Sequence, residues 1–186
     1  MIARPGIDFL AGQDYLEGMD FKTSLDPLAK GMTAVAFAIF GLLSLSQIYS
    51  YLRSPREMVD LAAMAVAIAI FAGLLLSTYS YSPLGYSVRD GALVIHRPWK
   101  PVVIPLEEIR AVQLVAPEEV RGGLRAFGVG GLFGYYGLFF YPRLGGYVRF
   151  YLRNKRNPIL LDTIRGKLLL SPDSSGLVPA LTAARS

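Results

Sequence analysis

The dominant pattern in the chain is a pair of long uncharged segments at residues 31–52 and 61–88. A polar octapeptide at residues 53–60 joins them. A helix needs about 20 apolar residues to cross the hydrocarbon core of a bilayer, and each segment is long enough. A linker as short as this one only turns the chain round. The pattern therefore predicts a transmembrane helical hairpin over residues 27–81.

Helix-start signals set the ends of the two predicted helices. Asp26 is a good N-cap, and Pro27 suits the first helical turn, where its missing N–H costs nothing. Residues 54–57, Ser-Pro-Arg-Glu, have the form of a capping box, in which the glutamate reaches back to the serine. We expect helices at about residues 27–52 and 55–80. This hairpin places both ends of the chain on the same side of the membrane.

Small residues recur along one face of each predicted helix, and such rows let helix backbones approach closely in lipid. The two rows could pack against each other, or one of them could dock another membrane subunit. The absence of charge from both segments argues against a proton relay, an ion path or a transport site. The rows are Gly31, Ala34, Ala38 and Gly41 in the first helix, and Ala65, Ala69, Gly73 and Ser77 in the second.

The first 26 residues form an acidic arm ahead of the hairpin. Residues 1–30 contain five acidic and three basic residues, and aromatic side chains are spaced through the arm. The arm could lie irregularly on the membrane surface, or it could dock on a neighbouring subunit. Its acid excess disfavours binding to anionic lipid and so favours a protein partner. The aromatic residues that would make this contact are Phe9, Tyr15 and Phe21.

After residue 81 the apolar pattern changes from helical spacing to short segments separated by turn residues. Asp90-Gly91 is a strong hairpin signal, and glycines concentrate between residues 122 and 146. Short strands at this spacing predict a small antiparallel β barrel or sandwich over residues 82–186, and Ser171-Pro172 can cap a short final helix. The expected strands cover residues 84–88, 92–97, 102–106, 111–115, 133–141, 147–153, 159–163 and 167–170.

Three parts of this region carry a resemblance to a known family. They are residues 103–109, the glycine run at residues 125–137, and the late Ser171-Pro172-Asp173. Together they resemble the bacterial pleckstrin-homology-like (PH-like) domains that are attached to membrane hairpins. The resemblance covers about residues 82–182 and implies a strongly bent, mostly antiparallel barrel closed by a short C-terminal helix. It implies binding or scaffolding and no reaction, because a fold alone does not give a function.

The strand expected at residues 147–153 alternates basic and aromatic residues with apolar ones. Period two places Val148, Phe150 and Leu152 in the core and the other set on the opposite face. That basic face could bind anionic lipid or an acidic subunit, or it could be an ordinary solvated surface. A tethered domain with seven acidic residues disfavours nucleic acid as the ligand. The basic face consists of Tyr147, Arg149, Tyr151 and Arg153, extended by Lys155 and Arg156.

Composition narrows the possible chemistry. The chain of 186 residues has no cysteine and one histidine, His96, which excludes disulfides, thiolate metal sites and c-type haem attachment. No spacing links a serine to His96 as a catalytic pair. Neighbouring residues in a strand point to opposite faces, so neither Glu107-Glu108 nor Glu118-Glu119 forms an acid/base dyad by itself. We therefore expect no enzymatic activity, no cofactor and no bound metal.

The distribution of basic residues predicts the orientation in the membrane. Near the helix ends, the terminal side carries four basic residues, whereas the turn carries two. Positive charge next to a membrane span favours the cytoplasm. Together with the family resemblance, this predicts a multi-pass protein of the bacterial inner membrane whose termini and PH-like domain are cytoplasmic.

These features predict a non-catalytic, integral-membrane accessory subunit. It would dock onto a larger membrane complex, respiratory or photosynthetic, through its helices, its acidic arm and its basic face. Its partners would be other integral-membrane subunits and membrane lipid, with no nucleic acid and no metal. The competing hypothesis is a membrane-anchored sensor whose PH-like domain binds anionic lipid or a small ligand.

Overall fold

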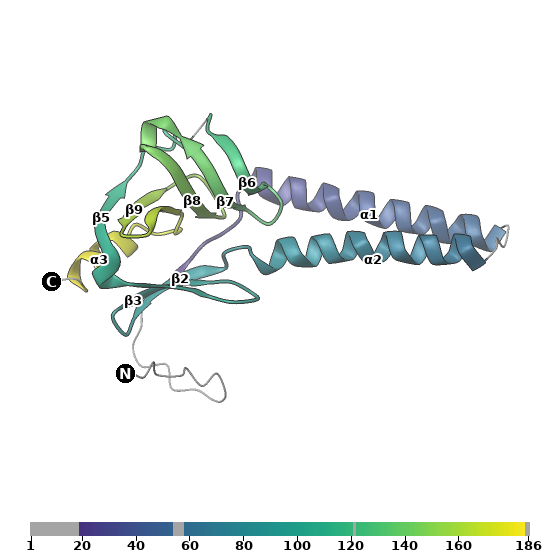
Figure 1. Ribbon diagram of the computed structural model, residues 1–186, viewed down its shortest axis with the longest axis horizontal. Coiled ribbons are helices and arrows are strands. Elements are labelled where there is room, and N and C mark those ends of the chain that lie inside the picture. Colours follow the sequence, from purple (N-terminus) through teal and green to yellow (C-terminus); the bar gives the residue numbers. More distant parts are fainter. Residues whose placement is uncertain (1–18, 54–57, 121, 185–186) are drawn as a thin grey trace.

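The computed structural model describes residues 19–53, 58–120 and 122–184, and Figure 1 shows a β domain from which two helices project. The helices, α1 (Pro27–Arg53) and α2 (Met58–Ser80), run side by side away from the domain. Both are long and apolar enough to cross a membrane, judged by length and composition. Only 6% of the most apolar 18-residue window of each helix is buried, so their apolar surface lies almost entirely outside the fold.

The first helix begins where the sequence predicts. Oδ1 of Asp26 accepts a hydrogen bond from the backbone N–H of Ala29 at 2.7 Å and so caps α1. Pro27 is the first helical residue, where no backbone N–H is needed. The hydroxyl of Tyr135 donates to the same carboxylate at 3.1 Å, which ties the cap to the β domain. The capping box expected at residues 54–57 lies outside the described residues.

One sheet contains strands from both sides of the helical hairpin. Its strands are β1 (Met19–Lys22), β2 (Gly85–Arg89), β3 (Ala92–His96) and β4 (Val102–Pro105). They are antiparallel and lie in the order β1-β2-β3-β4, with β2 and β3 joined by the expected Asp90-Gly91 turn. Strand β1 precedes α1 but pairs with β2, which follows α2. The segments that flank the two helices therefore lie at the same end of the hairpin.

A second, six-stranded sheet forms the rest of the domain. Its strands are β5 (Ile109–Leu114), β6 (Leu124–Gly130), β7 (Tyr135–Tyr141), β8 (Gly146–Leu152), β9 (Ile159–Thr163) and β10 (Gly166–Leu170). Their order is β5-β9-β10-β8-β7-β6, and all neighbours are antiparallel except β10 and β8. Among the described residues β5 does not pair with β6, so the sheet stays open. The expected barrel is thus corrected to two open, mostly antiparallel sheets.

Two clusters of buried side chains lie on opposite faces of the six-stranded sheet. The first contains residues from both sheets, and α3 (Leu177–Ala183) covers it with Leu177 and Leu181. The short final helix is confirmed, although it begins after Gly176 and not at Ser171-Pro172. The second cluster contains the three apolar residues that were expected in the core, Val148, Phe150 and Leu152.

The sequence pattern predicts no strand at β1 or β6, yet both form at sheet edges. Most side chains of β6 are exposed, so this strand lacks the alternation of a half-buried one. Phe21 of β1 packs against the first core cluster, and the Thr23 hydroxyl donates to the carbonyl of Ser171 at 2.6 Å. This end of the acidic arm therefore belongs to the β domain of its own chain, whereas Phe9 and Tyr15 lie outside the described residues.

The tip of the β6–β7 hairpin lies between the two helices, and we call this contact the junction. The Phe133 ring is 6.0 Å from the Phe37 ring of α1 and 5.3 Å from the Tyr79 ring of α2, edge to face in both cases. The backbone N–H of Phe133 donates to the hydroxyl of Thr33 at 3.0 Å. Phe133 has a φ of 55°, a left-handed conformation that is unfavourable for a bulky residue. The ring and amide contacts thus hold a strained backbone in place.

The two helices contact each other through large side chains. The rings of Phe40 and Phe71 stack with centroids 4.9 Å apart. Ala65, Ala69 and Gly73 are exposed, and a Cβ added at Gly73 would meet no atom within 4 Å. The small rows of the two helices therefore do not pack against each other. The row on α2 faces outward from the hairpin.

Two substitutions at Phe133 separate the packing of its ring from its backbone strain. We expect Phe133→Ala to destabilise the full chain by about 2 kcal/mol, because the ring is half-buried between the helices. Phe133→Gly loses the same ring but relieves the left-handed backbone, so it should be more stable than the alanine variant by ~1 kcal/mol. Thermal unfolding in a mild detergent measures both differences.

The control for this pair is Phe127→Ala, since 81% of the Phe127 side chain is exposed. It should change stability by no more than about 0.5 kcal/mol. Equal stability of the glycine and alanine variants at position 133 would show that the backbone there carries no strain.

Candidate functional site

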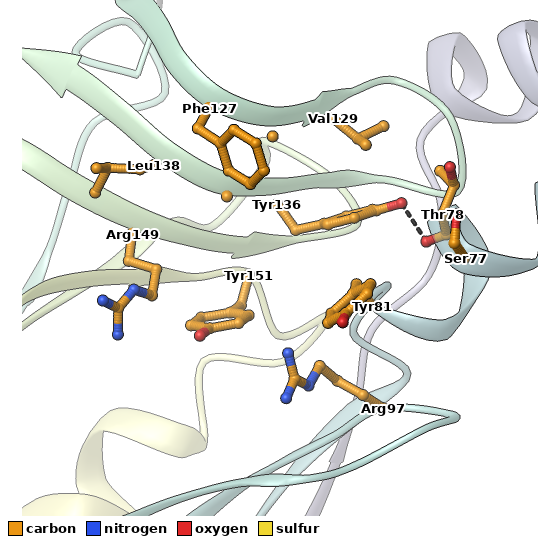
Figure 2. A pocket seen from close by; sticks show the side chains of 12 residues that line it. Ser77, Thr78, Tyr81, Arg97, Phe127, Val129, Tyr136, Leu138, Arg149 and Tyr151 are labelled. Atoms are coloured by element: carbon orange, nitrogen blue, oxygen red, sulfur yellow. Dashed lines mark hydrogen bonds between the residues drawn. The ribbon is translucent and has the colours of Figure 1, made fainter. Parts of the chain in front are cut away.

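A groove opens where the β domain meets the end of α2, and Figure 2 shows the side chains that line it. Its volume is about 620 Å³. The walls come from the last turns of α2, the segment after β3, the β6–β7 hairpin and β8. Segments far apart in the sequence therefore build this groove together.

Arg97 lies at one side of the groove and is held in a fixed orientation. Its Nε–H donates to the carbonyl of Lys100 at 2.7 Å. The guanidinium carbon is 5.6 Å from the centroid of the Tyr81 ring and 6.0 Å from that of Tyr151. Both distances lie in the range of cation–π attraction, which is about 6 Å. The planar guanidinium is thus positioned by two aromatic rings and one backbone carbonyl.

Arg149 supplies a second positive charge to the groove from strand β8. Among the described residues, no aspartate or glutamate lines the groove, and neither Arg97 nor Arg149 forms a salt bridge. Phe127, Leu138 and Val129 contribute apolar surface. The lining therefore combines two cations with apolar and aromatic walls and has no negative charge to balance them.

Tyr136 forms the end of the groove nearest the helices. Its hydroxyl donates a hydrogen bond to the carbonyl of Thr78 in α2, as the dashed line in Figure 2 marks. Burial raises the pKa of Tyr136 above its ordinary value, so the hydroxyl stays protonated and remains a donor. This bond closes the groove on the helix side and adds a polar link to the junction.

A pair of glycines forms the floor of the groove on the β6–β7 hairpin. Gly128 and Gly137 are register partners, with φ of 133° and 121°. A Cβ added at Gly128 would lie 2.3 Å from the carbonyl oxygen of Tyr136, and one at Gly137 would lie 2.3 Å from that of Phe127. Any side chain at either position would clash with the opposite strand. These glycines allow two backbones to approach closely, as expected for glycines in a bent strand.

Comparison with protein families gives a match that covers most of the β domain. The model of the bacterial PH domain family matches residues 84–181, slightly more than half of the chain. The chain belongs to the bacterial PH domain family. No curated protein and no solved structure matched it. The groove extends beyond the matched PH domain, because Ser77, Thr78 and Tyr81 precede residue 84.

The basic face predicted from the sequence is not a single surface of the PH domain. Arg149 is exposed at the groove, but Tyr151 is only 7% exposed and belongs to the first core cluster. At the end of β8 both faces of the strand are buried, because Tyr151 packs in the first cluster and Phe150 and Leu152 pack in the second. A period-two pattern identifies one buried face and cannot reveal that the other is buried too. Tyr147 is exposed on the same strand and lines a separate, smaller pocket.

The remaining members of the basic face, Arg153, Lys155 and Arg156, do not line the groove. Arg153 is half-buried, and burial lowers the pKa of its guanidinium below its ordinary value. The Nζ atom of Lys155 is 4.3 Å from the centroid of the Tyr135 ring. Arg156 is exposed, and its backbone N–H donates to Oδ1 of Asn154 at 3.0 Å. The structure therefore brings only Arg149 and Tyr151 of this set to the groove.

Sequence reasoning did not associate Arg97 and Phe127 with a site. The residues after β3 reach the end of α2, where the N–H of Trp99 donates to the carbonyl of Ser80 at 3.3 Å. This contact brings Arg97 beside Tyr81 and β8. The only local signal is the adjacency of basic and aromatic residues at positions 97–100, which also suits an ordinary turn.

His96 and the adjacent pairs Glu107-Glu108 and Glu118-Glu119 lie outside the groove. Nε2 of His96 is 2.8 Å from the hydroxyl oxygen of Ser87, on the neighbouring strand. Glu108 forms a salt bridge with Arg165. Within the described residues, no group of three or more histidine and acidic side chains is arranged to hold a metal ion.

The single histidine predicts a pH dependence of stability. Burial, with a smaller contribution from Arg89, lowers the pKa of His96 below its ordinary value of about 6.5. The unfolded chain therefore binds this proton more tightly than the folded chain. The folded state should lose stability as the pH falls from 7.5 to 5.5, and His96→Gln should flatten that slope. Thermal unfolding of both proteins across this range measures it, and equal slopes would contradict the assignment.

Proposed function

We propose that this bacterial PH domain protein is a non-catalytic docking subunit of the bacterial inner membrane. Its two helices span the bilayer, and its PH domain lies at the cytoplasmic surface. It would associate with a larger membrane complex through exposed surfaces of the helices and of the domain. The observation that carries the proposal is the fixed attachment of the PH domain to two exposed apolar helices.

The exposure of the helices supports a position in lipid. Leu42, Leu45 and Leu76 are each more than 60% exposed, and such side chains continue along both helices. Each apolar side chain left in water forfeits about 1.5–3 kcal/mol of burial free energy. Two adjacent helices that bury so little of their apolar surface in their own fold need an apolar solvent around them.

Aromatic residues at the base of the helices support a membrane surface located beside the end of α2. Tyr79 and Tyr81 lie at the end of α2 and are 41% and 53% exposed, and Trp99 in the adjacent loop is 79% exposed. Tyrosine and tryptophan favour the region between hydrocarbon and water, because their rings are apolar and their polar tips can be hydrated. These side chains mark the interface next to the PH domain.

The junction supports a docking role and not a loose tether. Phe133 contacts both helices, and Tyr136 bonds to the last turn of α2. The PH domain therefore has one position and one orientation relative to the helices. A partner that bound the helices would meet the same surface of the domain each time.

Single cysteines test the topology, because the natural chain has none. Met58 is 87% exposed at the start of α2, and Leu124 is 71% exposed on β6. A membrane-impermeant maleimide should label Met58→Cys in intact cells and Leu124→Cys only after permeabilisation. The reverse pattern would place the PH domain outside the cytoplasm. Protection of both positions in intact cells would show that the hairpin does not cross the membrane.

A second test addresses docking through the outward row of α2. Ala69→Leu places a larger side chain on that row, and Ala67→Leu makes the same change on another exposed face of the helix. Overpacking of a close contact costs about 1–3 kcal/mol, so Ala69→Leu should release roughly tenfold more free chain. Native electrophoresis of gently extracted membranes compares the variants with the unchanged protein. A free chain in the unchanged protein, or equal behaviour of both variants, would contradict docking by this row.

A further inference from the structure

We propose that the groove between α2 and the PH domain binds the headgroup of an anionic phospholipid from the surrounding leaflet. This inference rests on the proposed function, because it requires α2 to lie in a bilayer. It adds a specific ligand and its binding residues to the docking role. The phosphate would lie against Arg97 and Arg149, and the glycerol and upper acyl carbons would follow the apolar wall.

The position of the groove selects a ligand that comes from the membrane. Ser77 and Thr78 lie in the last turn of α2, and Tyr81 follows directly. With α2 in the bilayer, these residues lie at the level of the lipid headgroups. Figure 2 shows the groove beside the end of this helix, between the β6–β7 hairpin and the segment that carries Arg97. A lipid that packs against α2 reaches the groove without leaving the leaflet.

The charges of the groove favour a phosphate. Arg97 and Arg149 line it, and no acidic side chain among the described residues does. Guanidinium groups bind phosphate oxygens through two parallel hydrogen bonds, and charge-assisted bonds of this kind are about twice as strong as neutral ones. Because the Tyr81 and Tyr151 rings hold Arg97 in place, little side-chain freedom is lost when it binds.

The aromatic residues disfavour a choline headgroup. A quaternary ammonium binds to exposed aromatic faces. In this groove the Arg97 guanidinium already lies near the Tyr81 and Tyr151 rings, so a second cation would meet a positive charge there. An anionic headgroup such as phosphatidylglycerol adds no cation of its own. The groove should therefore distinguish anionic from zwitterionic lipids.

The size and apolar walls of the groove fit the rest of such a ligand. Its volume of about 620 Å³ falls within the range of about 300–1,000 Å³ that is usual for small-molecule sites. Phe127 and Leu138 line the side opposite the arginines' charged ends in Figure 2. These side chains can cover the glycerol backbone and the first methylene groups, and the acyl chains would continue along α2.

Native mass spectrometry of the full chain in detergent tests the proposal, with phosphatidylglycerol and phosphatidylcholine of identical acyl chains as probes. The unchanged protein should retain one phosphatidylglycerol about tenfold more tightly than phosphatidylcholine. Arg97→Gln and Arg149→Gln should each weaken phosphatidylglycerol binding by about five- to tenfold, because each removes a charge-assisted contact. Soluble glycerol phosphate at millimolar concentration should not displace the lipid.

Two further variants make the result specific to the groove. Arg143→Gln removes the same charge from an exposed position at the end of β7 away from the helices, and it should change binding by less than about twofold. Ser77→Trp fills the groove from α2 without a change in charge and should abolish the preference for phosphatidylglycerol. Thermal unfolding confirms that each variant is folded.

The proposal is overturned if the unchanged protein shows no preference between the two lipids, or if Arg143→Gln weakens binding as much as the groove variants. Unchanged lipid binding in Arg149→Gln and Ser77→Trp would also overturn it. Displacement by glycerol phosphate would identify a site for a soluble anion instead. The cysteine labelling described above separates these results from failure of the proposed function, since a chain can span the membrane and still lack lipid selectivity.

Discussion

The rest of the structure depends on the fit of one hairpin tip between two helices. Phe133 contacts an aromatic ring on each helix, and its amide bonds to Thr33. Two residues further on, the hydroxyl of Tyr135 reaches the Asp26 cap of α1, and the next residue, Tyr136, bonds to α2. Three residues within a segment of four therefore attach the PH domain to both helices. A domain held at two separated elements cannot rotate about either of them.

The groove exists because of this attachment. One wall belongs to α2 and the others belong to the β domain, so a flexible connection between them would leave two unrelated surfaces. The close backbone approach at Gly128 and Gly137 brings β6 and β7 together where they face α2. The strained backbone at Phe133 lies in the same hairpin. Strain and glycine pairing are thus concentrated at the place where a helical hairpin and a sheet must meet.

The parts of this molecule that are encoded locally could be predicted from the sequence. The helical hairpin, the Asp26 cap, the paired strands β7 and β8 and the family follow from runs, spacing and short motifs. Strands β1 and β6 could not be predicted, because edge strands with mostly exposed side chains lack the alternation of apolar and polar residues that marks a half-buried strand. The groove was missed for a different reason. It forms from Arg97, Arg149 and the end of α2, whose proximity depends on tertiary contacts that no local pattern contains.

The outward row of α2 connects the two proposals. Ala65, Ala69 and Gly73 recur at intervals of four, and the next position in the row is Ser77, which lines the groove. Residues four apart lie on one face of a helix, so the row leads from the middle of α2 to the groove. A lipid bound there would extend its acyl chains over the surface that a neighbouring helix would use. Lipid and partner must therefore either compete for this face or share it, with the headgroup above the docked helix.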